Sequence, residues 1–208
     1  KVVSDIDATG TSSWNGGAGF DSLGSTEETQ FNGTFDGGGH DITGLTIERP
    51  NEDGVGLFGF VGADGAVANV SVVEVDITGN RSVGGLAGNN SDGTVRDSSA
   101  SGNVTGIGFF VGGLVGISVN GITRDSSPSG NIEGNSIVGG LAGGNFNGTI
   151  QGSSASGNIK GNWSVGGFVG GSGGIVRDSS ASGNVTGNKR VGGLVGTDNG
   201  MVRDSSAS

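Results

Sequence analysis

The sequence predicts an all-β fold, a right-handed parallel β-helix (β-solenoid) with about 27 residues per coil. Three observations lead to this prediction. A hexapeptide recurs at nearly constant spacing through most of the chain. No window places apolar residues at helical spacing. Short β-branched segments alternate with Gly, Asn and Asp, which are residues typical of turns.

The repeat is the most specific of the three observations. Copies of VGGLVG or a close variant begin near residues 83, 111, 138, 165 and 191, and a degenerate copy, VGLFGFVG, begins near 55. Each copy is followed by a Gly- or Asn-rich turn and by a second segment such as GTVRDSSASGNVTG from Gly93. Self-similarity at a fixed period of this size indicates a stack of identical supersecondary units.

Each unit divides into three short segments, near residues 83–88, 94–100 and 103–105, which we interpret as the sides of one coil. Burying the apolar groups of one coil contributes on the order of 10 kcal/mol, whereas ordering its backbone costs about 1–2 kcal/mol per residue. An isolated coil is therefore unstable, and stacking about seven or eight coils in register, ~4.8 Å apart, joins the small cores into one column. The residues expected to point inward are Val83, Leu86, Val95, Ala100 and Val104. Val83 and Leu86 have opposite parity, so a bulge or bend is expected between them.

Two regions follow from the repeat. Residues 1–54 lack it and are predicted to form irregular capping coils, with Trp14, Phe20, Phe31 and Phe35 filling the open end of the column. Residues 55–208 are predicted to form the tandem β-helix repeats, the last of which is truncated at Ser208.

Composition and charge exclude several classes of protein. The 49 glycines follow no every-third spacing, which excludes collagen; no apolar run is long enough for direct membrane insertion, and there are no cysteines. A net charge of −10 argues against nucleic acid as a partner. The excess of Asp over Glu and of Arg over Lys suits a halophilic source, although mild acidity for solubility alone explains it equally well.

Stacking places equivalent residues of successive coils in columns. One column holds Arg96, Arg124, Arg177 and Arg203, and the next holds Asp97, Asp125, Asp178 and Asp204. Like charges one coil apart repel, so the two columns must be solvated or must pair with each other. The acidic column is either a stripe that collects cations such as Ca²⁺ or a row of corner residues that bond to backbone amides. The repeated serine pairs, Ser98–Ser99 and its equivalents, form ladders and are not catalytic nucleophiles.

Two isolated features bear on chemistry. The segment GGGHD at 37–41 has some likeness to calcium-binding nonapeptides, but one copy does not supply their stacked half-sites, so no cofactor is expected apart from this possible Ca²⁺. His40, between Asp36 and Asp41, is either a general base or, as we favour, a turn residue. The acids form columns and turns without one unique cluster, so the chain is predicted not to be an enzyme and to have no catalytic or metal-ligating residues.

Eight Asn-x-Ser/Thr sequons are candidate N-glycosylation sites. Two of them recur at one repeat position, which would place attached glycans in a line along one side. The eight are Asn32, Asn69, Asn80, Asn89, Asn103, Asn147, Asn162 and Asn184.

The succession of DIDATG, FNGTFDGGGHDITGLTI and VGLFGFVG with tandem VGGLVG units resembles the GLUG-motif repeat proteins. The resemblance covers nearly the whole chain. It implies a β-solenoid stalk or adhesin-like segment of a secreted or cell-surface protein, often beside adhesin or peptidase domains, and it supplies no consensus catalytic residues. One departure is that the Asn-Ser-Tyr segment typical of the family is here Asp97-Ser98-Ser99. The missing Tyr removes an exposed aromatic ring that could stack on sugars.

The combined prediction is a non-enzymatic, extracellular structural or adhesive segment of a larger cell-surface glycoprotein. Its expected partners are cell-surface glycans or another protein. The alternatives are a self-assembling extracellular filament subunit, in which coils associate end to end, and a polysaccharide-acting enzyme or virus spike of the β-helix fold.

Overall fold

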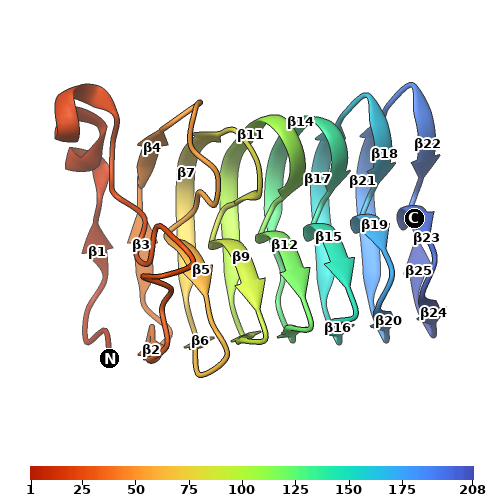
Figure 1. Cartoon of the computed structure of the whole chain (residues 1–208), viewed down its shortest axis with the longest axis horizontal. Helices are drawn as coiled ribbons and strands as arrows, with labels where there is room; N and C mark the ends of the chain where they lie inside the picture. The colour runs from red at the N-terminus through yellow and green to blue at the C-terminus, as the bar shows by residue number, and fades with distance from the viewer.

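The computed structural model describes all 208 residues as a single stack of parallel β-strands (Figure 1). Three sheets run along the stack, and every pair of strands within them is parallel, so each strand lies above its counterpart in the preceding turn. The β-solenoid predicted from the repeat is therefore confirmed, while its right-handed sense remains a prediction from chain chirality.

The strands of the three sheets follow one another in chain order around each turn. The first sheet contains β1 (Ile6–Asp7), β3 (Asp41–Thr43), β4 (Thr46–Glu48), β7 (Ser71–Gly79), β8 (Val83–Gly84), β11 (Ser99–Gly112), β14 (Ser129–Gly139), β17 (Ser154–Lys160), β18 (Trp163–Gly166), β21 (Ser180–Thr186), β22 (Lys189–Gly192) and β25 (Ser206–Ala207). The second sheet contains β2 (Thr34–Asp36), β6 (Ala66–Ala68), β10 (Thr94–Arg96), β13 (Ile122–Arg124), β16 (Thr149–Gln151), β20 (Ile175–Arg177) and β24 (Met201–Arg203). The third contains β5 (Phe58–Val61), β9 (Ala87–Ser91), β12 (Val115–Val119), β15 (Ala142–Phe146), β19 (Val169–Ser172) and β23 (Val195–Asp198).

The register between turns follows the sequence repeat. Val111 pairs with Val83 and Val138, and Val165 pairs with Val138 and Val191, so one turn advances by 26–28 residues. The third sheet has six strands, which corresponds to about six full turns. This is fewer than the expected seven or eight, because the chain before Phe58 contributes no strand to that sheet.

The segment boundaries differ from the expectation in one respect. The predicted segment 94–100 is divided: 94–96 belongs to the second sheet, whereas β11 begins at Ser99 and continues through 103–105. The reason is a corner at Asp97, whose φ of +50° turns the chain between the two sheets. The expected bend inside VGGLVG is present, since β8 ends at Gly84 and β9 begins at Ala87.

The core is one continuous column of 34 buried apolar residues. All five residues predicted to point inward, Val83, Leu86, Val95, Ala100 and Val104, are at most 2% exposed. Each turn therefore completes its core with apolar groups from the turns on either side, as the stability argument requires.

The glycine that ends each hexapeptide has a packing role. A Cβ atom on Gly143 would lie 2.4 Å from the backbone nitrogen of Val111, and one on Gly170 would lie 2.5 Å from that of Val138. A chain segment of the preceding turn thus passes directly over this position, and only glycine leaves room for it. The residue just before each of these valines, such as Phe110 and Ile137, has a positive φ.

Residues 1–54 are less regular. The 3₁₀ segment η1 (Thr9–Gly17) lies at the N-terminal end of the stack (Figure 1). Trp14 packs near Phe20, with 6.3 Å between ring centroids. Phe31 and Phe35 contact the buried ring of Phe58, at 5.0 and 5.3 Å, and so join this region to the repeats.

Candidate functional site

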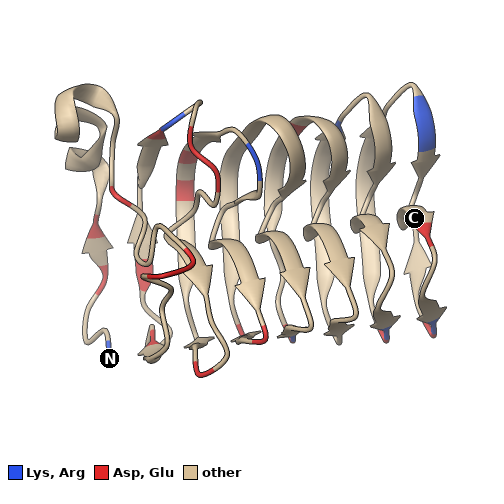
Figure 2. Ribbon diagram, viewed as in Figure 1, with Lys and Arg blue, Asp and Glu red and all other residues tan.

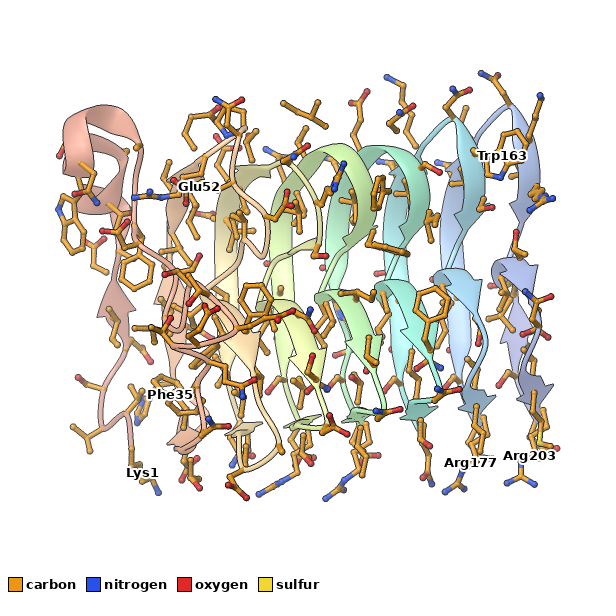
Figure 3. All side chains as sticks on the ribbon, in the orientation of Figure 1. Lys1, Phe35, Glu52, Trp163, Arg177 and Arg203 are labelled. Carbon is orange, nitrogen blue, oxygen red and sulfur yellow. The ribbon has the colours of Figure 1, made fainter.

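The Arg and Asp columns lie at the corner that follows the second sheet, and three of the four Arg–Asp neighbours pair with each other. Arg96 donates to Asp97 at 2.5 Å, Arg124 to Asp125 at 2.9 Å and Arg177 to Asp178 at 3.2 Å. Figure 2 shows these charges along the lower edge of the stack, and Figure 3 shows Arg177 and Arg203 pointing away from it. Because each pair is partly solvent-exposed, it stabilises the fold by only about 0–1 kcal/mol.

The Asp residues of this column are corner residues, as one of the two interpretations expected. Their φ angles lie between +49° and +53°, a conformation that Asp tolerates better than most residues. Gly152 occupies the equivalent corner where Asp is missing, with a φ of +60°. The Asp carboxylates accept hydrogen bonds from their Arg neighbours rather than from the expected backbone amides. Gln151, which interrupts the Arg column, accepts a hydrogen bond from Arg177 of the next turn.

The serines beside this corner form a buried ladder. The Ser126 hydroxyl donates to the carbonyl oxygen of Arg124 at 2.8 Å and accepts the backbone N–H of Ser98 at 3.3 Å. The same pair of bonds recurs in successive turns, so each hydroxyl satisfies two backbone groups. The ladder consists of Ser98, Ser126, Ser153, Ser179 and Ser205. These hydroxyls are structural, and no base lies beside them to make a nucleophile.

A second ladder crosses the exposed face of the first sheet. The Asn131 amide donates to the side-chain oxygen of Asn103 at 3.1 Å, and Asn158 and Asn184 continue the row at 3.0 Å each. Two predicted sequon residues, Asn103 and Asn184, are therefore its ends. Asn131 and Asn158 lack the hydroxyl residue of a sequon.

The remaining sequon residues lie at turns and strand ends. Asn32, Asn147 and Asn162 are exposed, whereas Asn69, Asn80 and Asn89 are half-buried. The Asn69 amide already donates to Asp36 at 3.0 Å.

A buried polar column, which the sequence reasoning missed, runs inside the third sheet. Asn90, Ser118, Asn145 and Ser172 occupy equivalent positions and are at most 2% exposed. The Asn145 amide donates to the carbonyl oxygens of Gly148 and Ile175, at 3.4 and 3.3 Å, while the side-chain oxygens of the column have no protein partner. The sequence did contain a signal for this column, because a polar residue recurs at the same repeat position within an otherwise apolar strand.

His40 lies in a turn, and its partner is neither of its sequence neighbours. Its Nδ1 is 3.1 Å from Oδ1 of Asp5, which also accepts the backbone N–H of Asp41 at 3.1 Å. The Asp41 amide and then His40 lower the pKa of Asp5. The Asn69 amide, the Gly38 N–H and Lys1 likewise lower the pKa of Asp36. No three His, Asp or Glu side chains converge as metal ligands there or elsewhere in the chain.

A groove near the C-terminal end brings together residues that the sequence reasoning did not connect. It has a volume of about 210 Å³, and Phe146, Trp163, Ser164, Gly171, Arg190 and Thr197 are among the residues that line it. Trp163 is 40% exposed at the upper rim of the stack (Figure 3). The equivalent positions in neighbouring turns are Ser136 and Lys189, so the tryptophan is a departure from the repeat. That departure was the signal that sequence reading could have used.

A second cavity, of about 240 Å³, lies between η1 and the first turn. Its walls are mainly apolar and include Trp14, Phe20, Phe35 and Leu57.

Comparison with known proteins agrees with the repeat and the fold. The family model described as "The GLUG motif" matches residues 79–105, 134–160 and 161–186. The chain carries GLUG motif repeats. Each matched segment is about one turn of the solenoid. The three segments run from the end of β7 into β11, from β14 to the end of β17, and from just after β17 to the end of β21.

Two curated relatives match about half of the chain. Halomucin from Haloquadratum walsbyi is 40% identical over 107 residues, which are 50% of this chain and 1% of that protein. A "Putative Gly-rich membrane protein" from Evansella cellulosilytica is 38% identical over 93 residues, which are 43% of this chain and 10% of that protein. The matched segments are thus small parts of both relatives. No helix of this structure has the length and apolarity needed to cross a membrane.

One solved structure shares the fold. A "putative immunoglobulin A1 protease" from Bacteroides ovatus superposes with a TM-score of 0.68 over 97% of this chain and 69% of its own. At 19% identity, this similarity establishes a common β-solenoid and carries no activity to this chain.

Proposed function

We propose that this chain is a non-enzymatic, extracellular segment of a larger cell-surface protein, in which GLUG turns form a rigid stalk or adhesive surface. The observation that carries the proposal is the parallel pairing of strands from turn to turn in all three sheets. Each added turn lengthens such a stack by ~4.8 Å, and the serine ladder links the successive turns from Val70 to Ser205.

The side chains that could do chemistry are engaged in this architecture. The serine ladder bonds to the backbone, the Arg and Asp columns pair with each other, and His40 pairs with Asp5 in a turn. Hydrolysis of a glycosidic bond needs two carboxyl groups on either side of one bond, with their pKa values set apart. The acids here are instead distributed along corners and turns.

The extracellular location and the halophilic source rest on the relatives and on charge. One relative is a halomucin and another is described as a membrane protein. A net charge of −10 favours hydration in concentrated salt. Glycans on the exposed sequon residues, among them Asn103 and Asn184 on one face, are part of the proposal. Mass spectrometry of proteolytic peptides of protein from its native source tests it: peptides that contain these asparagines and have only their polypeptide mass would contradict glycosylation.

A cleavage screen combined with sedimentation tests the central proposal. We expect no products when the chain is incubated with acidic polysaccharides or with immunoglobulin A1, and we expect one sedimenting species at all concentrations. Cleavage products from either substrate would contradict the non-enzymatic assignment. Growth of the sedimenting species with concentration would instead favour the end-to-end filament.

A further inference from the structure

Two cations lie beside Trp163 and form no ion pair with a carboxylate, and one of them, Arg190, also lines the groove. The ion pairs of the structure take up Lys1, Arg49, Arg96, Arg124, Lys160 and Arg177. Lys189 and Arg190 stay outside these pairs, although acids outnumber bases by two to one in the chain. Figure 2 shows them as a basic segment on β22.

Both cations lie against the same indole ring. The Lys189 ammonium nitrogen is 4.8 Å from the centroid of Trp163, and the Arg190 guanidinium carbon is 5.1 Å from it. The ring attracts each cation, but the two positive charges repel each other across a short distance. An anion bound beside them would relieve this repulsion and would gain charge-assisted hydrogen bonds.

The backbone directs Arg190 into this position. Arg190 has a φ of +54°, and the equivalent residues Phe110, Ile137 and Ser164 share this conformation. In each turn this residue lies over the third sheet: the Phe110 ring packs 5.7 Å from that of Phe146, and the Ser164 hydroxyl is 2.9 Å from that of Thr197. The guanidinium therefore extends from a fixed part of the fold into the lining of the groove.

Glycine makes the groove open at this point. Ile117 and Thr197 occupy the same third-sheet position as Gly144 and Gly171, where side chains are missing. A Cβ on Gly171 would contact Cγ2 of Ile137 at 3.2 Å. The volume of the groove, about 210 Å³, is larger than the ~150 Å³ of a cavity that holds benzene, so the groove accommodates one six-membered ring.

The lining combines the groups that recognise a sugar ring. Trp163 and Phe146 offer aromatic surface, and Ser136, Ser164, Thr197 and Asn199 offer hydroxyl and amide groups. The planar guanidinium of Arg190 matches the two oxygens of a carboxylate. We propose that the groove binds one hexuronate unit of an acidic polysaccharide. This inference deepens the adhesive part of the proposed function and rests on it.

Tryptophan fluorescence provides a direct test. The chain has two tryptophans, so the Trp14→Phe chain reports on Trp163 alone. We expect trigalacturonate to change the fluorescence of this chain saturably, and we expect its fully methyl-esterified, neutral form to bind at least tenfold more weakly.

Repeat positions supply matched variants. Arg190→Ser introduces the residue found at Ser164, and Lys189→Ser the residue found at Ser136, so both substitutions have precedents in this fold. We expect Arg190→Ser to weaken binding about tenfold or more and Lys189→Ser about threefold. The control Arg203→Ser removes one charge from the second sheet and should change the affinity less than twofold. Circular dichroism checks that each variant is folded.

Three results would overturn the inference: no saturable change with trigalacturonate, equal binding of its neutral ester, or an equal loss of affinity in Arg203→Ser and Arg190→Ser. The last would show attraction by charge alone. A folded, single-species chain that ignores trigalacturonate and cleaves nothing would leave the stalk function in place. A chain that cleaves the trisaccharide would contradict the proposed function itself.

Discussion

Residues 1–54 carry ten acidic and two basic side chains, whereas residues 55–208 carry ten acidic and eight basic ones. The first region therefore holds −8 of the net charge of −10. Figure 2 shows the corresponding concentration of acidic segments toward the N-terminal end. In the repeats, eight of the eighteen charged side chains form ion pairs with a partner in the same or the next turn.

The two regions also pack differently. In the repeats, each turn presents the same groups to its neighbours, so a hydrogen bond that forms between two turns can recur between the following ones. In residues 1–54 the contacts are unique, as in the rings of Trp14 and Phe20 or the Asp5–His40 pair. The comparison teaches that repetition lets small side chains such as Ser and Gly specify a fold, whereas the irregular end depends on aromatic rings. One tryptophan in each region, Trp14 and Trp163, allows the two to be followed separately.

The largest expected effect concerns the ring that joins the regions. Phe58 is fully buried and contacts both Phe31 and Phe35. We expect Phe58→Ala to reduce the free energy of unfolding by about 3–5 kcal/mol and to separate the urea transition of Trp14 from that of Trp163. The fluorescence of single-tryptophan chains measures both. Transitions that still coincide after this loss would show that Phe58 does not couple the regions.

A smaller loss is expected from crowding the backbone of a repeat turn. Gly130 has a φ of +138°, and a Cβ there would lie 2.2 Å from the carbonyl oxygen of Gly102. We expect Gly130→Ala to cost about 3 kcal/mol, measured by urea denaturation. Gly10→Ala is the control in the irregular region, because a Cβ there meets nothing within 4 Å. Similar losses in both variants would refute the steric argument.

The serine ladder should contribute less. Ser126→Ala removes the acceptor of the Ser98 N–H and the donor to the Arg124 carbonyl, and both backbone groups remain in a buried region. The expected loss in the free energy of unfolding is about 1–3 kcal/mol. Its exposed neighbour gives the matched variant, Ser127→Ala, which should change stability by less than about 0.5 kcal/mol. Equal effects would mean that the ladder is not stabilising.

The smallest effect is a difference in acid sensitivity. The carboxyl groups of Asp5, Asp7, Glu28 and Asp36, all in residues 1–54, have a lowered pKa because they accept hydrogen bonds. A lowered pKa in the folded state means that their contribution is present above the unfolded pKa near 4 and is lost as pH falls through the folded value. We therefore expect the urea midpoint reported by Trp14 to fall more between pH 6 and pH 3 than that reported by Trp163. Equal shifts of the two urea midpoints would contradict the prediction that residues 1–54 are more sensitive to acid.

Much of the repeat region could be predicted because one repeat constrains all the others. Val83, Leu86 and Val95 were expected inside, and the corner at Asp97 was one of two interpretations of its column. Strand boundaries were less accurate, since a φ of +50° at Asp97 divides a segment that looks continuous in sequence. The candidate groove was missed because a repeat draws attention to what recurs, whereas Trp163, Lys189 and Arg190 are departures from it.

The sequence by itself determined the period of the stack, the parallel pairing of its turns and the apolar column, because side chains repeated every 26–28 residues can be buried together only if the turns lie in register. The tertiary structure alone decided that His40 pairs with Asp5, that each Ser hydroxyl joins two turns, and that Trp163 meets Arg190 beside Gly171. These contacts join residues 26–35 positions apart, and their geometry depends on where each corner turns the backbone, which local sequence does not specify.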